Sequence, residues 1–456
     1  MQKESVPVFI DTETYSDATK RHSLEQLIRQ HCPSLFTPFE PPWWLNNGHL
    51  QTTYTALAGG KSVPKIQYMR YNIVSFSSDG SENYYFHTYN DFIPNRKLIR
   101  LEDGGTLALD LFPQDPSAFP LSTPILVILT GLTGSSNEGY VRVILSKLHT
   151  HRAIIINYRG CGGIPLTSPR LYTCGNTDDI RTALAYISNM YPHAPLHGLG
   201  FSLGAGIMTR YVAEEGEKSR LRSICCLACP WNMAANNRSL LSTYVGRKVY
   251  APALGANFRE MVKQNMEVFQ SSSPEIHKAA REVVAIRRIT LGQFDDIFTR
   301  RVRAYGPQFP FLALDELYEW GSSDHVLSTV RVPALYINAD DDPIVSRLPK
   351  DGGGSPNVFL HVTSGGGHLG WHTPGYSYLN GFSTRQWTTE PVLEWLKLMA
   401  TTEVETENGF TPSTIVAGPN GIYHEVDRPD VFWQELDQAK LLMVPTAKQS
   451  GTIRGF

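Results

Sequence analysis

The stretch PLHGLGFSLGAGIMTRYVAEEG, residues 195–216, contains the pattern Gly-x-Ser-x-Gly at Gly200, Ser202 and Gly204. A short apolar run typical of a β-strand comes before the serine, and a run with helical character follows it. A serine at a sharp turn from strand to helix projects its hydroxyl from the sheet edge, and flanking glycines prevent collisions with the neighbouring strand and helix. The start of such a helix also offers backbone N–H groups to a developing oxyanion. The pattern therefore predicts a nucleophilic Ser202; the simpler alternative is a glycine-serine loop that only begins a helix.

Short strands and helices alternate around this stretch. Five apolar runs of strand length are found at 124–132, 153–158, 223–229, 333–339 and 358–362. Continuously apolar runs are typical of strands that are covered on both faces. Their alternation with helical patterns predicts an α/β fold with a mostly parallel central sheet flanked by helices.

The alternation stops between residues 231 and 325, where the sequence is helical, aromatic and interrupted by prolines. We expect this segment to be a helical lid inserted into the core. The core then has two parts, 41–230 and 326–400. An N-terminal extension (1–40) precedes it, and a polar C-terminal tail (401–456) follows, which we expect to pack loosely.

The composition excludes several classes of protein. Of 456 residues, 41% are hydrophobic and 18% are charged, which is too apolar for a disordered chain. The net charge of -2 gives no electrostatic basis for nucleic acid binding. The six cysteines do not form a disulfide framework, and Cys226-x-x-Cys229 lacks the further ligands of a zinc site, so no metal or organic cofactor is expected. The N-terminus lacks a signal-peptide pattern and no apolar run is long enough to cross a membrane, which favours a soluble, cytoplasmic protein.

A serine nucleophile requires a base and an orienting carboxylate. The strand run at 333–339 ends in Asp340, Asp341 and Asp342, at a position where side chains face the crevice that binds ligands in α/β sheets. We favour Asp342 as the carboxylate because it lies one turn beyond the strand and directly before a proline. Asp341 is the second candidate, and an acidic turn without a chemical role is the remaining interpretation.

The predicted base is His368, in the segment SGGGHLGW (364–371) after the next strand run. The glycines allow the loop to bring the imidazole over the sheet edge; His372 is the alternative. The oxyanion requires two donors. We expect the backbone N–H of Leu203, which follows the nucleophile, and that of Leu132, in the Gly-rich loop after the strand run at 124–132. This loop lacks the Gly-Lys-Ser/Thr sequence of a nucleotide-binding P-loop.

Taken together, these segments resemble the YheT-like branch of the α/β-hydrolases. This branch includes yeast medium-chain fatty-acid ethyl ester synthase/esterases and mammalian abhydrolase-domain lipases. The resemblance covers about residues 40 to 400. Besides the serine motif, it depends on NGHLQT (47–52), DGGT (103–106), a strand ending in Leu109-Asp110, GLTGS (131–135), NYRGC (157–161) and TLGQFDD (290–296).

The resemblance implies a triad of Ser202, Asp342 and His368 that hydrolyses acyl or lipid esters through an acyl-enzyme. Some members transfer the acyl group to an alcohol, so an O-acyltransferase with the same site is the alternative. A non-catalytic binding protein on a hydrolase scaffold is a third hypothesis. The sequence departs from the family at one position, since the oxyanion loop usually begins with His-Gly and Thr130 precedes Gly131 here.

Overall fold

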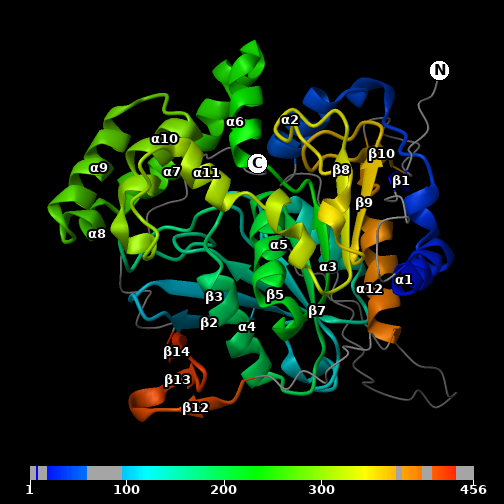
Figure 1. Ribbon diagram of the computed structural model, residues 1–456, viewed down its shortest axis with the longest axis horizontal. Coiled ribbons are helices and arrows are strands. Elements are labelled where there is room, and N and C mark those ends of the chain that lie inside the picture. Colours follow the sequence, from blue (N-terminus) through cyan, green and yellow to red (C-terminus); the bar gives the residue numbers. More distant parts are fainter. Residues whose placement is uncertain (1–6, 9–17, 59–94, 376–382, 403–412, 438–456) are drawn as a thin grey trace, which may run out of the picture.

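A computed structural model describes residues 7–8, 18–58, 95–375, 383–402 and 413–437 of the chain. Within these residues, one twelve-stranded sheet runs through the molecule in the order β1-β9-β8-β7-β6-β4-β5-β3-β2-β14-β13-β12 (Figure 1). The six neighbouring strands from β9 to β5 are parallel, and the strands on both sides of them pair antiparallel. The mostly parallel sheet predicted from the sequence is therefore confirmed.

The parallel strands lie where the apolar runs predicted them, and the antiparallel strands extend the sheet at its two edges. The parallel strands are β4 (Ile125–Leu129), β5 (Arg152–Asn157), β6 (Leu196–Phe201), β7 (Leu221–Leu227), β8 (Ala334–Ala339) and β9 (Val358–Thr363). The antiparallel strands are β1 (Pro7–Val8), β2 (Asn95–Arg100), β3 (Thr106–Phe112), β12 (Ile415–Ala417), β13 (Ile422–Glu425) and β14 (Arg428–Leu436). A separate hairpin consists of β10 (His372–Pro374) and β11 (Thr384–Gln386).

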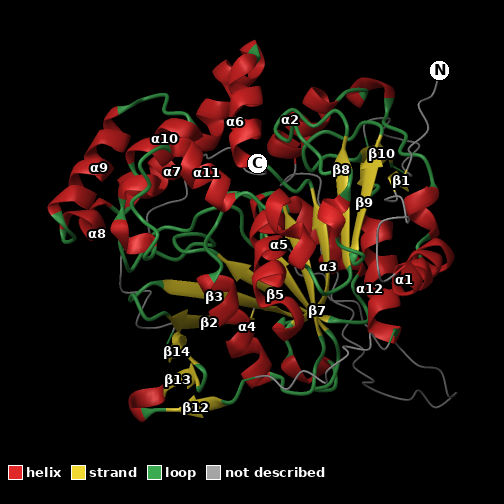
Figure 2. Cartoon of the chain, in the orientation of Figure 1, coloured by secondary structure: helices red, strands yellow, loops and turns green. Residues whose placement is uncertain are grey.

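Helices cover both faces of the sheet (Figure 2). Along β4, Val127 packs into the hydrophobic core on one face, whereas its neighbours Leu126 and Ile128 pack into the core on the other. This burial on both faces explains why the strand is apolar at every position. The first core includes α4 (Asp178–Met190) and α5 (Leu203–Glu215), and the second includes α1 (Ala18–His31), α3 (Gly139–Lys147) and α12 (Thr389–Thr401).

Between β7 and β8 the chain forms a group of helices that lies apart from those covering the sheet, on the upper left of Figure 1. We call residues 231–325 the lid segment. It has its own aromatic contacts, including the stacked rings of Phe258 and Phe294, whose centroids are 4.8 Å apart. Its helices are α6 (Met233–Ser242), α7 (Ala251–Gln264), α8 (Met266–Gln270), α9 (Pro274–Ala285), α10 (Leu291–Ile297) and α11 (Leu314–Gly321), with a π-helix at Gly246–Tyr250.

The expectation that the C-terminal tail packs loosely is wrong for its described part. Strand β14 pairs with β2 and carries β13 and β12 with it, so the tail extends the sheet. Val431 and Trp433 of β14 are each 1% exposed, and Glu425 forms a buried ion pair with Arg220 at 2.6 Å. Along β14 the buried Val431 and Trp433 alternate with the less buried Phe432 and Gln434, as expected for a strand buried on one face only.

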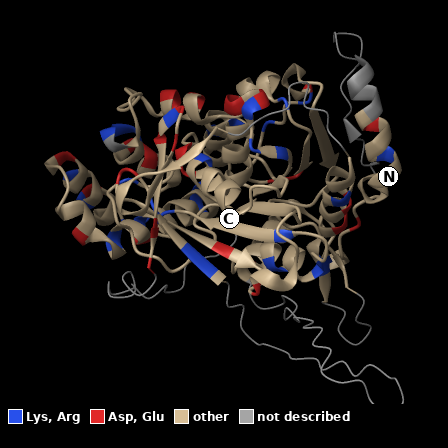
Figure 3. Cartoon of the chain, turned by 90° about the horizontal axis from the view of Figure 1, so that it is seen from below, with Lys and Arg blue, Asp and Glu red and all other residues tan. Residues whose placement is uncertain are grey.

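The described residues contain no helix with the length and apolarity needed to cross a membrane. Basic and acidic residues are mixed over the elements visible in Figure 3. All six cysteines are free, and five of them are buried.

A buried carboxyl group in the lid segment, that of Asp295, is expected to make the stability of the protein depend on pH. Asp295 accepts hydrogen bonds from Thr299 Oγ1 (2.7 Å) and Tyr318 Oη (2.8 Å), and burial raises the pKa of Asp295 to about 6. The folded protein therefore binds this proton more tightly than the unfolded chain does, so the contribution of Asp295 to stability decreases as the pH rises from about 4 through about 6. Over this range we expect the Asp295 contribution to the free energy of unfolding to fall by roughly 3 kcal/mol, so the difference in stability between the wild type and Asp295→Asn should change with pH by about that amount.

Urea unfolding at pH 4.5 and pH 7.5 measures this difference. The matched control is Asp296→Asn, because the Asp296 side chain is 40% exposed and paired with Arg300. An Asp295→Asn variant with the same pH dependence as the wild type would contradict the prediction.

Candidate active site

Ser202 occupies the sharp turn between β6 and α5. Its backbone has φ 50° and ψ -117°, a conformation that L-residues rarely adopt. The turn requires glycine at both neighbouring positions, because a side chain at either one would collide with the backbone. A Cβ on Gly204 would lie 2.5 Å from the carbonyl oxygen of Leu129, and a Cβ on Gly200 would lie 2.6 Å from Ala205 Cα. The turn therefore presents the Ser202 hydroxyl at the carboxyl end of the parallel strands.

Two hydrogen bonds connect Ser202, His368 and Asp342 in a chain. His368 Nε2 is 2.7 Å from Ser202 Oγ, and His368 Nδ1 is 2.7 Å from Asp342 Oδ2. The side chains of His368 and Asp342 are 1% and 0% exposed. The other Asp342 oxygen accepts the backbone N–H groups of Ile344 (2.8 Å) and Val345 (3.0 Å), which fixes the carboxylate toward the imidazole. The structure thus brings together the three residues selected from the sequence.

The two preceding aspartates bind the backbone of the histidine loop instead of an imidazole. Asp340 Oδ1 accepts the N–H of Gly365, and Asp341 Oδ1 accepts the N–H of Gly367, both at 2.8 Å. All three consecutive carboxylates therefore contact the loop that carries His368. Asp341, the second candidate for the orienting carboxylate, supports this loop through Gly367, whereas the imidazole is bonded to Asp342.

The alternative histidine, His372, lies outside this chain of hydrogen bonds. Its Nε2 is 2.9 Å from Thr55 Oγ1, and its backbone N–H donates to Gln51 Oε1 at 2.8 Å. Burial lowers the pKa of His372 to about 4, so its imidazole is neutral near pH 7. His372 contributes to the packing of the histidine loop against α2 (Gly48–Ala58).

Helix α2 supports His368 directly. Thr52 Oγ1 accepts the backbone N–H of His368 (2.8 Å) and donates to the carbonyl of Gly48 (2.7 Å). The approach is close, since a Cβ on Gly48 would lie 2.0 Å from the Asp341 carbonyl oxygen. Sequence reasoning found the NGHLQT segment only as part of a family resemblance and did not identify Thr52 as a support for His368.

The two expected oxyanion donors lie on segments that are bonded to each other. Leu203 is the first residue of α5, where a backbone N–H has no intrahelical acceptor. Among the described residues, no acceptor is found for this N–H or for that of Leu132. The Gly204 N–H donates to the Thr130 carbonyl (3.1 Å), which holds the loop containing Leu132 beside the serine turn. The role of these two amides as oxyanion donors stays a prediction.

No group of three or more His, Cys, Asp or Glu side chains in the described ranges is arranged to hold a metal ion. The arrangement at Ser202 requires none, because a serine, an imidazole and a carboxylate in hydrogen-bond contact can carry out acyl transfer alone.

Comparison with known proteins now assigns the family. Residues 124–373, more than half of the chain, match the family described as alpha/beta hydrolase fold. The chain belongs to the alpha/beta hydrolase family. The matched range extends from β4 to β10 and contains Ser202, Asp342 and His368. The fold class expected from the sequence, an α/β-hydrolase fold, is confirmed.

Several relatives of this alpha/beta hydrolase carry lipase names. A monoacylglycerol lipase of Saccharomyces cerevisiae is 30% identical over 86% of this chain and 87% of its own length. Phospholipase ABHD3 of Mus musculus is 27% identical over 80% of this chain and 79% of its own. Among solved structures, a putative lipase (lip1) from Acinetobacter baumannii AYE is 16% identical, with a TM-score of 0.42, and covers 69% of this chain and 92% of that one.

Proposed function

We propose that this alpha/beta hydrolase cleaves carboxylic esters through an acyl-enzyme on Ser202, with His368 as general base and acid and Asp342 as the orienting carboxylate. The observation that carries this proposal is the buried chain of hydrogen bonds, with 2.7 Å on each side of the imidazole. A serine hydroxyl is a weak nucleophile, and an adjacent base that a carboxylate holds in the correct tautomer is the arrangement that activates it.

In the first half of the reaction, Ser202 Oγ bonds to the ester carbonyl carbon while its proton moves to His368 Nε2. Asp342 holds the imidazole by Nδ1 and stabilises its charged form. The carbonyl oxygen becomes an oxyanion that accepts the N–H groups of Leu203 and Leu132; one such donor accelerates the reaction about 10²–10³-fold. The tetrahedral species then expels the alcohol, which takes the proton from His368.

In the second half, a water molecule gives a proton to His368 and attacks the acyl carbon. Collapse of the second tetrahedral species releases the carboxylic acid and returns the proton to Ser202. An alcohol that reaches the acyl-enzyme in place of water would give its proton to His368 and accept the acyl group by the same steps. We therefore include acyl transfer to an alcohol as a second reaction of the same site.

We further propose that the substrate is an acyl ester or lipid and that the lid segment covers it. The names of the relatives, monoacylglycerol lipase and phospholipase, support this substrate class. The segments NGHLQT, DGGT and NYRGC support assignment to the YheT-like branch of the family.

A series of p-nitrophenyl esters from acetate to palmitate tests this proposal. We expect turnover of these esters, with kcat/KM highest in one range of chain lengths and no turnover of the matching anilides. Added ethanol or glycerol should convert part of the acid product into a new ester. A folded protein that turns over no ester of the series would overturn the proposal and favour a non-catalytic binding protein, whereas acid as the sole product at high alcohol would exclude the transfer reaction.

A further inference from the structure

The loop that contains Leu132 is held by tyrosine hydroxyls. Thr130 begins this loop, and its own hydroxyl is buried without a partner among the described residues, so the Thr130 side chain does not fix the loop. Instead, three buried tyrosines bind the loop backbone. The hydrogen bonds are Gly131 N–H to Tyr140 Oη (3.2 Å), Tyr158 Oη to the Thr130 carbonyl (3.0 Å) and Thr133 N–H to Tyr172 Oη (2.9 Å).

The bond from Tyr172 acts on the most strained residue of the loop. Thr133 has φ 56°, a value that is unfavourable for a β-branched residue and persists only when surrounding contacts impose it. The Tyr172 hydroxyl accepts the N–H of this residue, immediately after Leu132. Loss of that bond removes one restraint on Thr133, and a return of this residue to a negative φ would rotate the peptide units next to Leu132.

The ring of Tyr172 lies between the core and the lid segment. It stacks on Tyr158 with centroids 4.4 Å apart and contacts Phe258 of α7 at 5.3 Å. Phe258 in turn stacks on Phe294 of α10. A continuous series of ring contacts therefore connects the lid helices to the tyrosine whose hydroxyl holds Thr133.

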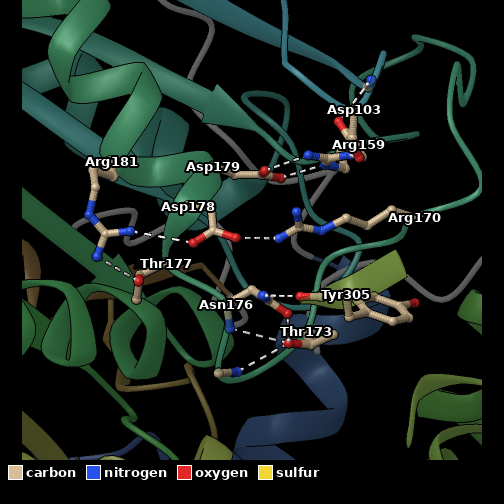
Figure 4. A network of polar contacts seen from close by, with 12 residues as sticks. Asp103, Arg159, Arg170, Thr173, Asn176, Thr177, Asp178, Asp179, Arg181 and Tyr305 are labelled. Carbon is tan, nitrogen blue, oxygen red and sulfur yellow. Dashed lines mark hydrogen bonds and ion pairs between the residues drawn. The ribbon is translucent and has the colours of Figure 1, made fainter. Parts of the chain in front are cut away.

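A polar network fixes the segment of chain that carries Tyr172 (Figure 4). At its start, the buried guanidinium of Arg159 binds both oxygens of Asp179 (2.7 and 2.8 Å) and also binds Asp103. Toward its end, Asn176 Nδ2 donates to the carbonyl of Tyr305 in the lid segment at 2.9 Å. These contacts leave Tyr172 little freedom to follow the loop if the loop moves.

We propose that Tyr172 is a positioning residue that holds the oxyanion loop in its strained conformation and makes the Leu132 donor depend on the packing of the lid segment. This inference rests on the proposed function, because it assigns the Leu132 N–H to the oxyanion. Phe258 is the contact on the lid side, and Tyr158 is the contact on the core side.

The variant Tyr172→Phe tests the hydroxyl alone. We expect kcat for a p-nitrophenyl ester to fall about tenfold, the effect of one lost hydrogen bond, with KM changed less than about twofold. A trifluoromethyl ketone, which forms a tetrahedral oxyanion on the serine, should bind about tenfold more weakly. The matched control is Tyr211→Phe. Tyr211 is also buried, and its hydroxyl also accepts a backbone N–H, that of Arg220 (3.2 Å), which lies beyond the C-terminal end of α5. The control should leave both values unchanged.

A double-mutant cycle tests the connection to the lid segment. Phe258→Leu alone should weaken binding of the ketone. When Tyr172→Phe is already present, adding Phe258→Leu should weaken ketone binding by less than about twofold more, because both changes act through the same hydroxyl. Fully additive effects would overturn the link to the lid segment.

Two outcomes separate this inference from the proposed function. If Ser202→Ala abolishes hydrolysis but Tyr172→Phe binds the ketone as tightly as the wild type, Tyr172 has no positioning role and the proposed function stands. If Ser202→Ala leaves hydrolysis unchanged, the proposed function fails and the inference fails with it. Equal losses in Tyr172→Phe and Tyr211→Phe, accompanied by a lower melting temperature in both, would indicate a purely structural role and also overturn the inference.

Discussion

Replacing Ser202 with alanine is expected to lower kcat for ester hydrolysis roughly 10⁶-fold, close to complete loss. The reason is that the acyl-enzyme requires the oxygen that lies 2.7 Å from His368 Nε2, and in the described part of the chain no other side chain is bonded to this nitrogen. Alanine keeps the Cβ of serine, so it fits the same turn at φ 50°. The fold should therefore persist, which a melting temperature within a few degrees of the wild type would verify.

A fluorophosphonate probe gives a second measurement of the same change. The wild type should be labelled stoichiometrically and Ser202→Ala not at all. Ser242→Ala is the matched control, because Ser242 is exposed on the lid segment and bonds only a neighbouring carbonyl in the described part of the chain. Equal labelling of wild type and Ser202→Ala would refute the assignment of the nucleophile.

The second large effect is expected for Asp342→Asn, with kcat lowered about 10⁴-fold. The Asp342 carboxylate accepts the Nδ1 proton of His368 at 2.7 Å and so leaves Nε2 unprotonated toward Ser202. Its other oxygen is fixed by backbone N–H groups, so the asparagine is expected to turn its NH₂ group toward the imidazole. That group donates to Nδ1, which moves the proton to Nε2, where it blocks acceptance of the serine proton. The pH dependence of kcat should change as well, because the group that stabilises the charged imidazole is lost.

Asp341→Asn is the matched control for this prediction. Its carboxylate accepts the backbone N–H of Gly367 and also that of Gly48, and an asparagine oxygen can keep the Gly367 bond. We expect less than about a tenfold effect. Comparable losses in the Asp341 and Asp342 variants would mean that the imidazole is oriented by the loop as a whole and not by Asp342.

The architecture of this hydrolase could be predicted because its parallel strands are buried on both faces. Such strands are continuously apolar, as in β4 and β5. In the helices between them, apolar residues recur with the spacing of a helical turn, so the two kinds of element can be told apart. The C-terminal strands could not be predicted in the same way. Strand β14 depends on pairing with β2, a partner more than 300 residues earlier in the chain, and on a buried ion pair between Arg220 and Glu425. Neither contact leaves a local pattern in the sequence.

The candidate site was predictable where a motif determines the local geometry. The glycines around Ser202 indicate a sharp turn, and the strand end before Asp342 indicates a position at the sheet edge. Their catalytic roles stay predictions. The supporting residues could not be identified, since Thr52 and Tyr172 reach the site from separate parts of the chain. A tyrosine that holds a backbone N–H resembles, in sequence, any other buried tyrosine.

The three consecutive aspartates after β8 have a consequence for how this protein can vary. Asp340, Asp341 and Asp342 each bind a different point of the loop from Gly365 to His368, and the pairings keep the same order along both segments. Inserting or deleting one residue in either segment would shift every pairing and bring the wrong carboxylate to the imidazole. We therefore expect related proteins that keep these three contacts to keep the length of both loops as well.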